Sequence, residues 1–168
     1  MFGGPSVCKS TIAASVFSEL KWDGVNCEFA SEYAKDKVWE KSLNTLNNQV
    51  YVFGKQHHRI WKLKGQTEVV VCDSPLLFSI IYDADKDIYL RNLVINEFSK
   101  CRNMNYFIVR KAKYNPIGRL QTEEKSIEKD NEIRSLLDTL SVKYTILDGV
   151  KDSVQVILND VLKELKGN

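Results

Sequence analysis

The sequence lacks the features that mark secreted, membrane-spanning and metal-clustered proteins. Its 168 residues include no apolar run long enough to span a bilayer and no signal peptide. Its four cysteines stand singly, without a C-x-x-C pair or metal-binding spacing, so we expect reduced thiols in the cytoplasm. The net charge of +2 gives no basic excess for binding nucleic acid.

The chain also has no linker, internal repeat or low-complexity tract that would divide it. Hydrophobic residues make up 43% and charged residues 27%, which is typical of a soluble globular protein. A chain of 168 residues is long enough to bury one substantial core. We therefore predict a single domain over residues 1–168.

The most informative stretch is GGPSVCKST, at residues 3–11. It fits the phosphate-binding pattern G-x-x-x-x-G-K-[ST] at every fixed position except the last glycine. A glycine-rich turn directs successive backbone N–H groups at one anion, and the following helix adds its positive end. Lys9 would reach the β- and γ-phosphates of a nucleotide, and the Ser10 hydroxyl would hold Mg²⁺. The residues predicted to bind the nucleotide cofactor are Gly3, Gly4, Pro5, Ser6, Val7, Cys8, Lys9, Ser10 and Thr11.

Two features depart from the phosphate-loop pattern. Cys8 replaces the glycine that lets the backbone take a positive φ and approach a phosphate closely. Only Met1 and Phe2 precede Gly3, where a buried strand normally aims the loop. Cys8 should weaken nucleotide binding unless the turn absorbs its side chain. Either the first strand is cut to a stub or upstream residues are missing from this sequence, and the loss of that strand counts against full activity. The alternative is an ordinary glycine-rich turn before a helix.

Acidic residues follow two predicted strands. Glu32 comes after the strand 25–30, and Asp73 ends the apolar strand 68–73. The carboxyl end of a parallel strand faces the ligand crevice, so Glu32 is a candidate general base or hydroxyl ligand. Asp73 stands where a carboxylate holds Mg²⁺ or its water beside a phosphate loop. The alternatives are a first-turn helix charge for Glu32 and a helix cap for Asp73.

A basic segment, residues 110–122, follows the predicted strand 106–109. It contains Arg110 and Arg119 together with turn-forming residues. Such a segment suits a lid that neutralises charge on a transferring phosphoryl group, with both arginines in catalytic roles. An ordinary basic surface loop is the alternative, and a role in nucleic-acid binding is possible but less favoured.

The predicted strands alternate with helices and carry continuous apolar residues. This pattern indicates an α/β fold, with a parallel sheet covered by helices on both faces. Glu32, Asp73 and Arg110 each follow a strand, so they should converge with the phosphate loop. We expect one long helix over residues 43–63, with Gln56 and Arg59 facing either a substrate or solvent.

Four stretches of the chain carry a family resemblance: EYAKDKVWE at 32–40, QVYVFGKQ at 49–56, CDSPLL at 72–77 and YNPIGRLQTEE at 114–124. They resemble phage-type AAA-domain P-loop proteins. These are similar to the nucleoside and nucleotide kinases, a group that includes the ribosylnicotinamide kinase domain of a bacterial NAD regulator. The resemblance implies a three-layer P-loop NTPase fold with a parallel five-stranded sheet of order 2-3-1-4-5, here with its first strand truncated. It also implies ATP and Mg²⁺ as cofactors, and a phage-encoded protein in the host cytoplasm.

Carried over to matching positions, the resemblance makes Lys9 and Ser10 ligands of phosphate and Mg²⁺. It implies that Asp73 helps to hold the metal and that Arg110 and Arg119 are the arginines of the lid. We expect ATP-dependent phosphoryl transfer to a nucleoside or nucleotide-like small molecule, with Glu32 or Asp73 orienting or deprotonating the acceptor. The alternatives are a kinase of modified bases in phage DNA, an ATPase or nucleotide-sensing module, and a degenerate binding protein without activity.

Overall fold

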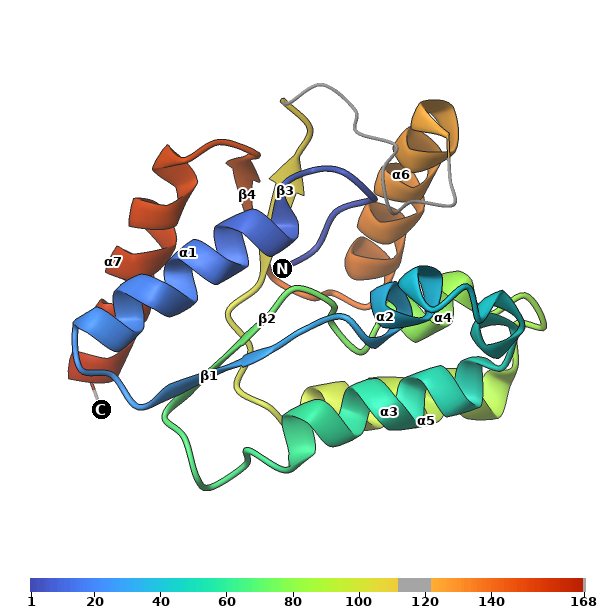
Figure 1. The fold of residues 1–168 in the computed structure, drawn as a ribbon, viewed down its shortest axis with the longest axis horizontal. Helices are drawn as coiled ribbons and strands as arrows, with labels where there is room; N and C mark the ends of the chain where they lie inside the picture. The colour runs from blue at the N-terminus through green and yellow to red at the C-terminus, as the bar shows by residue number, and fades with distance from the viewer. Residues whose placement is uncertain (112–121, 168) are drawn as a thin grey trace.

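The computed structural model describes residues 1–111 and 122–167. In this part of the chain, helices and short parallel strands alternate as the sequence predicts (Figure 1). The elements are α1 (Lys9–Trp22), β1 (Cys27–Ala30), α2 (Tyr33–Trp39), the 3₁₀ helix η1 (Leu43–Asn47), α3 (Gln49–Trp61), β2 (Val69–Cys72), α4 (Phe78–Tyr82), α5 (Ile88–Ser99), β3 (Tyr106–Val109), α6 (Glu123–Thr139), β4 (Thr145–Asp148) and α7 (Asp152–Lys166).

The strands form two parallel pairs, so the predicted five-stranded sheet is wrong. β1 pairs with β2, and β3 pairs with β4, each through four residues. Between the pairs, Phe2 forms a single parallel bridge to Phe107 of β3. Its N–H donates to the Tyr106 carbonyl at 2.7 Å, and its carbonyl accepts from the Ile108 N–H at 2.9 Å.

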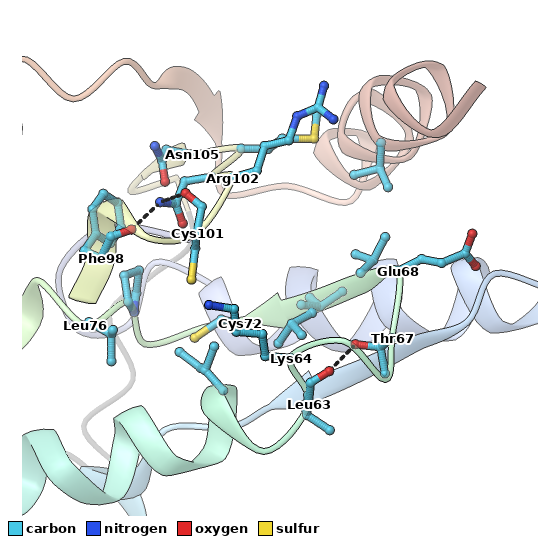
Figure 2. Close-up of a pocket in the computed structure, with 18 of the residues that line it drawn as sticks. Leu63, Lys64, Thr67, Glu68, Cys72, Leu76, Phe98, Cys101, Arg102 and Asn105 are labelled. Atoms are coloured by element: carbon cyan, nitrogen blue, oxygen red, sulfur yellow. Dashed lines mark hydrogen bonds between the residues drawn. The ribbon is translucent and has the colours of Figure 1, made fainter. Parts of the chain in front are cut away.

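On the opposite side, the Met1 amino group donates to the Cys72 carbonyl of β2 at 2.7 Å. Met1 and Phe2 therefore touch both strand pairs, but they are too few to form a continuous ladder. A cavity of about 480 Å³ separates β2 from the start of β3. Figure 2 shows it with Leu63 and Thr67 on one side and Cys101 and Asn105 on the other. The cavity therefore lies between the two strand pairs.

Buried apolar side chains form two cores, one on each side of the strands. The first packs α1 and α7 against the strands, and α1 and α7 are in direct contact (Figure 1). The second lies on the other side, under α3, α4, α5 and α6. Successive residues of β3 point alternately into the two cores: Tyr106 and Ile108 into the first and Phe107 into the second. The strand is therefore buried on both faces, as its continuous apolar sequence predicts.

The helix predicted over residues 43–63 is divided in the structure. Residues 43–47 form η1, and α3 begins only at Gln49. The cause is Asn48, whose side-chain oxygen accepts the Tyr51 N–H at 3.0 Å and caps α3. Thr122 caps α6, because its hydroxyl accepts the Lys125 N–H at 3.4 Å. Within the described ranges, none of the helices has the length and apolar character needed to cross a membrane.

Candidate functional site

The glycine-rich loop runs from Gly3 to the start of α1, and its backbone is unusual at three positions. Gly3 has φ 129°, Ser6 has φ 64° and Cys8 has φ 66°. A Cβ at Gly3 would lie 2.8 Å from the Ile108 carbonyl, so the loop approaches β3 as only glycine permits. Positive-φ residues of this kind occur in backbone nests, in which successive N–H groups can face one anion.

Lys9, the first residue of α1, folds its side chain back over the loop. Its Nζ donates to the Gly4 carbonyl at 2.6 Å and lies 5.7 Å from the centre of the Phe78 ring. The ammonium is therefore held beside the loop. Ser10 follows on the same first turn of α1 and is only partly buried. Thr11 is exposed.

Arg110 follows β3, as predicted, and its guanidinium reaches the loop. Nη1 donates to the Pro5 carbonyl at 2.7 Å, and Nη2 pairs with Asp130 of α6 at 3.0 Å. The other Asp130 carboxylate oxygen accepts the Gly4 N–H at 2.5 Å. Arg110 and Asp130 are mostly buried, with side-chain exposures of 13% and 18%. The pair therefore attaches α6 to the glycine-rich loop.

Asp73 follows β2 and is 3% exposed. Its Oδ1 is one of two buried side-chain polar atoms in the described ranges without a hydrogen-bond partner, and the other is Nε of Arg110. Burial lowers the pKa of the nearby Met1 amino group, while the charges of Cys72 and Asp73 raise it and that of Lys9 lowers it. Asp73 and Lys9 therefore both lie within electrostatic range of the Met1 amino group.

The donor set fits Mg²⁺ bound with a nucleotide. A buried carboxylate oxygen without a partner is costly unless a cation or water satisfies it, and Mg²⁺ prefers such oxygens. Mg²⁺ commonly uses one or two protein oxygens together with water and phosphate, and Asp73 and Ser10 could supply them. In the described ranges, no group of three or more His, Cys, Asp or Glu side chains forms a separate metal cluster.

Glu32 also lies where the sequence predicts, at the carboxyl end of β1. Ala30 pairs with Cys72, so Glu32 and Asp73 follow neighbouring strands at the same edge. Glu32 occupies the N-cap position of α2, but its side chain makes no capping hydrogen bond. The alternative for Glu32 was a charge in the first helical turn, but Glu32 lies one residue before α2, and the acid in that turn is Asp36.

Two side chains of α3 hold the turn that carries Glu32. Gln56 is buried; it accepts the Tyr33 N–H at 2.8 Å and donates to the Ser31 carbonyl at 3.2 Å. Arg59 donates to the Ser31 hydroxyl at 2.7 Å and pairs with Asp36. Neither side chain belongs to a freely solvated helix face. Both position the segment on which Glu32 sits.

Sequence reasoning did not identify Asp130, which contacts both Gly4 and Arg110. In the sequence, Asp130 is one of several acids on a predicted helix rich in charged residues, and nothing nearby marks it as different from the others. The predicted catalytic residue Arg119 lies outside the described residues. The structure brings together Lys9, Arg110 and residues 3–8, with Asp73 on the neighbouring strand pair.

The 480 Å³ cavity does not coincide with this site. Its lining includes Met1, Cys72 and Leu76, but no residue of the stretch 3–11. Its wall combines the end of α3 and residues 63–72 with residues 97–106 and the second half of α7. The candidate site is instead the glycine-rich loop itself, where Lys9, Arg110 and Asp130 of α6 contact it.

Cys8 adopts the left-handed conformation that glycine takes without cost. A side chain there costs about 1 kcal/mol, so Cys8→Gly should raise the free energy of unfolding by about that amount. It should also strengthen Mg-ATP binding, because the backbone can then approach the phosphate. Urea unfolding and calorimetry would measure both effects. Cys8→Ala is the control: it removes the thiol but keeps Cβ, so a similar gain there would contradict the conformational explanation.

Comparison with known proteins gives one match. A family model described as AAA domain matches residues 1–155. Neither the curated proteins nor the solved structures give a match.

Proposed function

The chain belongs to the AAA-domain family of P-loop NTPases, which implies nucleotide binding, and we propose that it transfers the γ-phosphoryl group of ATP to a nucleoside or nucleotide-like small molecule. The observation that carries this proposal is that the cationic groups of Lys9 and Arg110 both contact the same loop. Nζ of Lys9 contacts the Gly4 carbonyl, and Nη1 of Arg110 contacts the Pro5 carbonyl. Two cations are thus held beside a phosphate-binding backbone.

In this proposal the protein acts through position and charge. Phosphoryl transfer passes through a state whose charge spreads over oxygens, so fixed cations accelerate it without a covalent intermediate. Lys9 neutralises the β- and γ-phosphate oxygens, and Arg110 adds its charge from the β3 side. Backbone N–H groups of the loop and the positive end of α1 orient the phosphates.

Mg²⁺, when bound, would neutralise the charge that develops on the phosphate oxygens. Ser10 and Asp73 are the residues that would hold it. Glu32 orients or deprotonates the acceptor hydroxyl, because it follows the strand next to Asp73 at the same edge. Gln56 and Arg59 support this role by fixing the Ser31 backbone.

The direct test is transfer of labelled γ-phosphate from Mg-ATP to a panel of nucleosides and nucleotides. The expected result is one labelled acceptor whose formation requires Mg²⁺. The control is a matched reaction with Glu32→Gln, which should bind Mg-ATP normally but transfer more slowly if Glu32 acts on the acceptor. Phosphate release that no acceptor increases would contradict kinase activity and support an ATPase.

A second candidate function is nucleotide binding without catalysis. The left-handed Cys8 favours it, because a side chain occupies the position where the backbone should approach a phosphate. In that case Mg-ATP would bind without transfer or hydrolysis, and the Cys8→Gly protein would bind it more tightly. Transfer by the unaltered chain would exclude this candidate.

A further inference from the structure

Asp130 of α6 contacts the glycine-rich loop directly. One carboxylate oxygen accepts the Gly4 N–H at 2.5 Å, and the other pairs with Nη2 of Arg110 at 3.0 Å. α6 stands beside the N-terminal loop in Figure 1. The approach is close enough to require glycine, because a Cβ at Gly4 would lie 2.6 Å from the Ser126 carbonyl of α6.

This arrangement places a negative charge where the proposed ligand brings more negative charge. The carboxylate is mostly buried, so water screens its repulsion of phosphate only partly. It also neutralises Arg110, whose two terminal nitrogens are engaged by Asp130 and the Pro5 carbonyl. Nε of Arg110 is buried without a hydrogen-bond partner in the described ranges, so this guanidinium has unused donor capacity.

We infer that Asp130 is a positioning residue that holds Arg110 against the loop in the absence of nucleotide and competes with phosphate for its guanidinium. This inference rests on the proposed function. Asp130 acts through Arg110: it fixes where the guanidinium lies and weakens its charge toward phosphate until a ligand's oxygens replace the carboxylate. A guanidinium can exchange a carboxylate oxygen for a phosphate oxygen without changing its own position, because both are anionic hydrogen-bond acceptors.

The decisive variant is Asp130→Asn. The amide oxygen can still accept the Gly4 N–H, but the charge that pairs with Arg110 is lost. Mg-ATP should bind about three- to tenfold more tightly, as expected when one like charge is removed beside a partly buried anion site. The gain should shrink as salt is raised from about 0.05 to about 0.5 M. If Asp130 had a purely structural role, Asp130→Asn would weaken Mg-ATP binding, because losing the contact would loosen the loop.

Three companion proteins make the calorimetric test specific. Glu132→Gln removes the same charge from an exposed position of α6 and should leave affinity unchanged. Asp130→Glu keeps the charge and should not gain affinity. In an Arg110→Met background, Asp130→Asn should give a smaller gain than in the unaltered chain, because part of its effect passes through Arg110. An unchanged or weaker affinity in Asp130→Asn, or an equal gain in both backgrounds, would overturn the inference.

A measurement on the unaltered chain avoids any dependence on variant folding. The ¹⁵N resonance of Arg110 Nε should shift when Mg-ADP is added, because the guanidinium exchanges its partner. Binding without that shift would overturn the inference but leave the proposed function standing. Failure of both this chain and Cys8→Gly to bind Mg-ATP or Mg-ADP would contradict the proposed function, and this inference with it.

Discussion

Replacing Lys9 by alanine should lower phosphoryl transfer about 100-fold or more. Removing one fixed donor that stabilises transition-state charge typically costs two to three orders of magnitude. Lys9 is positioned for this role, because its Nζ already lies 2.6 Å from the Gly4 carbonyl of the loop. The measurement is the initial rate of labelled phosphate transfer, with Mg-ATP affinity determined by calorimetry on the same samples.

Lys163→Ala is the matched control for this experiment. Lys163 is an exposed lysine on α7, so its removal changes the net charge equally without touching the loop. It should retain the rate of the unaltered chain. Full turnover by the Lys9 variant would show that phosphate is bound elsewhere, and the assignment of residues 3–11 would then be wrong.

Replacing Gly4 by alanine should destabilise the fold by about 2 kcal/mol and abolish detectable nucleotide binding. The new Cβ would lie 2.6 Å from the Ser126 carbonyl and 2.7 Å from Oδ1 of Asp130. The carboxylate can rotate away, but the carbonyl belongs to the helix backbone, so α6 itself must shift. Overpacking of this kind typically costs about 1–3 kcal/mol. Urea unfolding gives the stability, and calorimetry gives the affinity.

Gly54→Ala offers a control with the same chemical change. Gly54 lies inside α3, and a Cβ there would meet no atom within 4 Å. Alanine is a better helix former than glycine, so this variant should gain roughly 0.5–1 kcal/mol of stability. If both glycine variants had equal stability, the close contact between Gly4 and α6 would not be real.

Local patterns in the sequence were sufficient to predict the strands and most helices. Continuous β-branched residues such as those at 69–71 identify buried strands, and Thr122 identifies the start of α6. The division of residues 43–63 was missed because the apolar period continues across Asn48. The cap at Asn48 competes with the helix, and the side-chain geometry that decides this competition cannot be read from periodicity.

The positions of the candidate site residues were predictable where a residue directly follows a strand. Asp73 and Arg110 follow β2 and β3, as the strand pattern predicts, although these strands belong to different pairs. Asp130 was not predictable, because it is 126 residues from Gly4 and lies in the middle of a helix. Its contact depends on how closely α6 approaches the loop, which is a property of tertiary packing.

The division between the strand pairs bears on how the molecule unfolds. In the described ranges, the backbone hydrogen bonds that link the pairs are those of Met1 and Phe2. The core beneath α1 and α7, however, contains residues from both pairs, including Cys27 and Val71 on one side and Tyr106 and Ile108 on the other. The cooperativity that joins the two halves therefore resides in side-chain packing rather than in a continuous backbone ladder. Amide protons of β1 and β3 should therefore exchange slowly for the same reason, which is that the layer formed by α1 and α7 stays packed against both strand pairs.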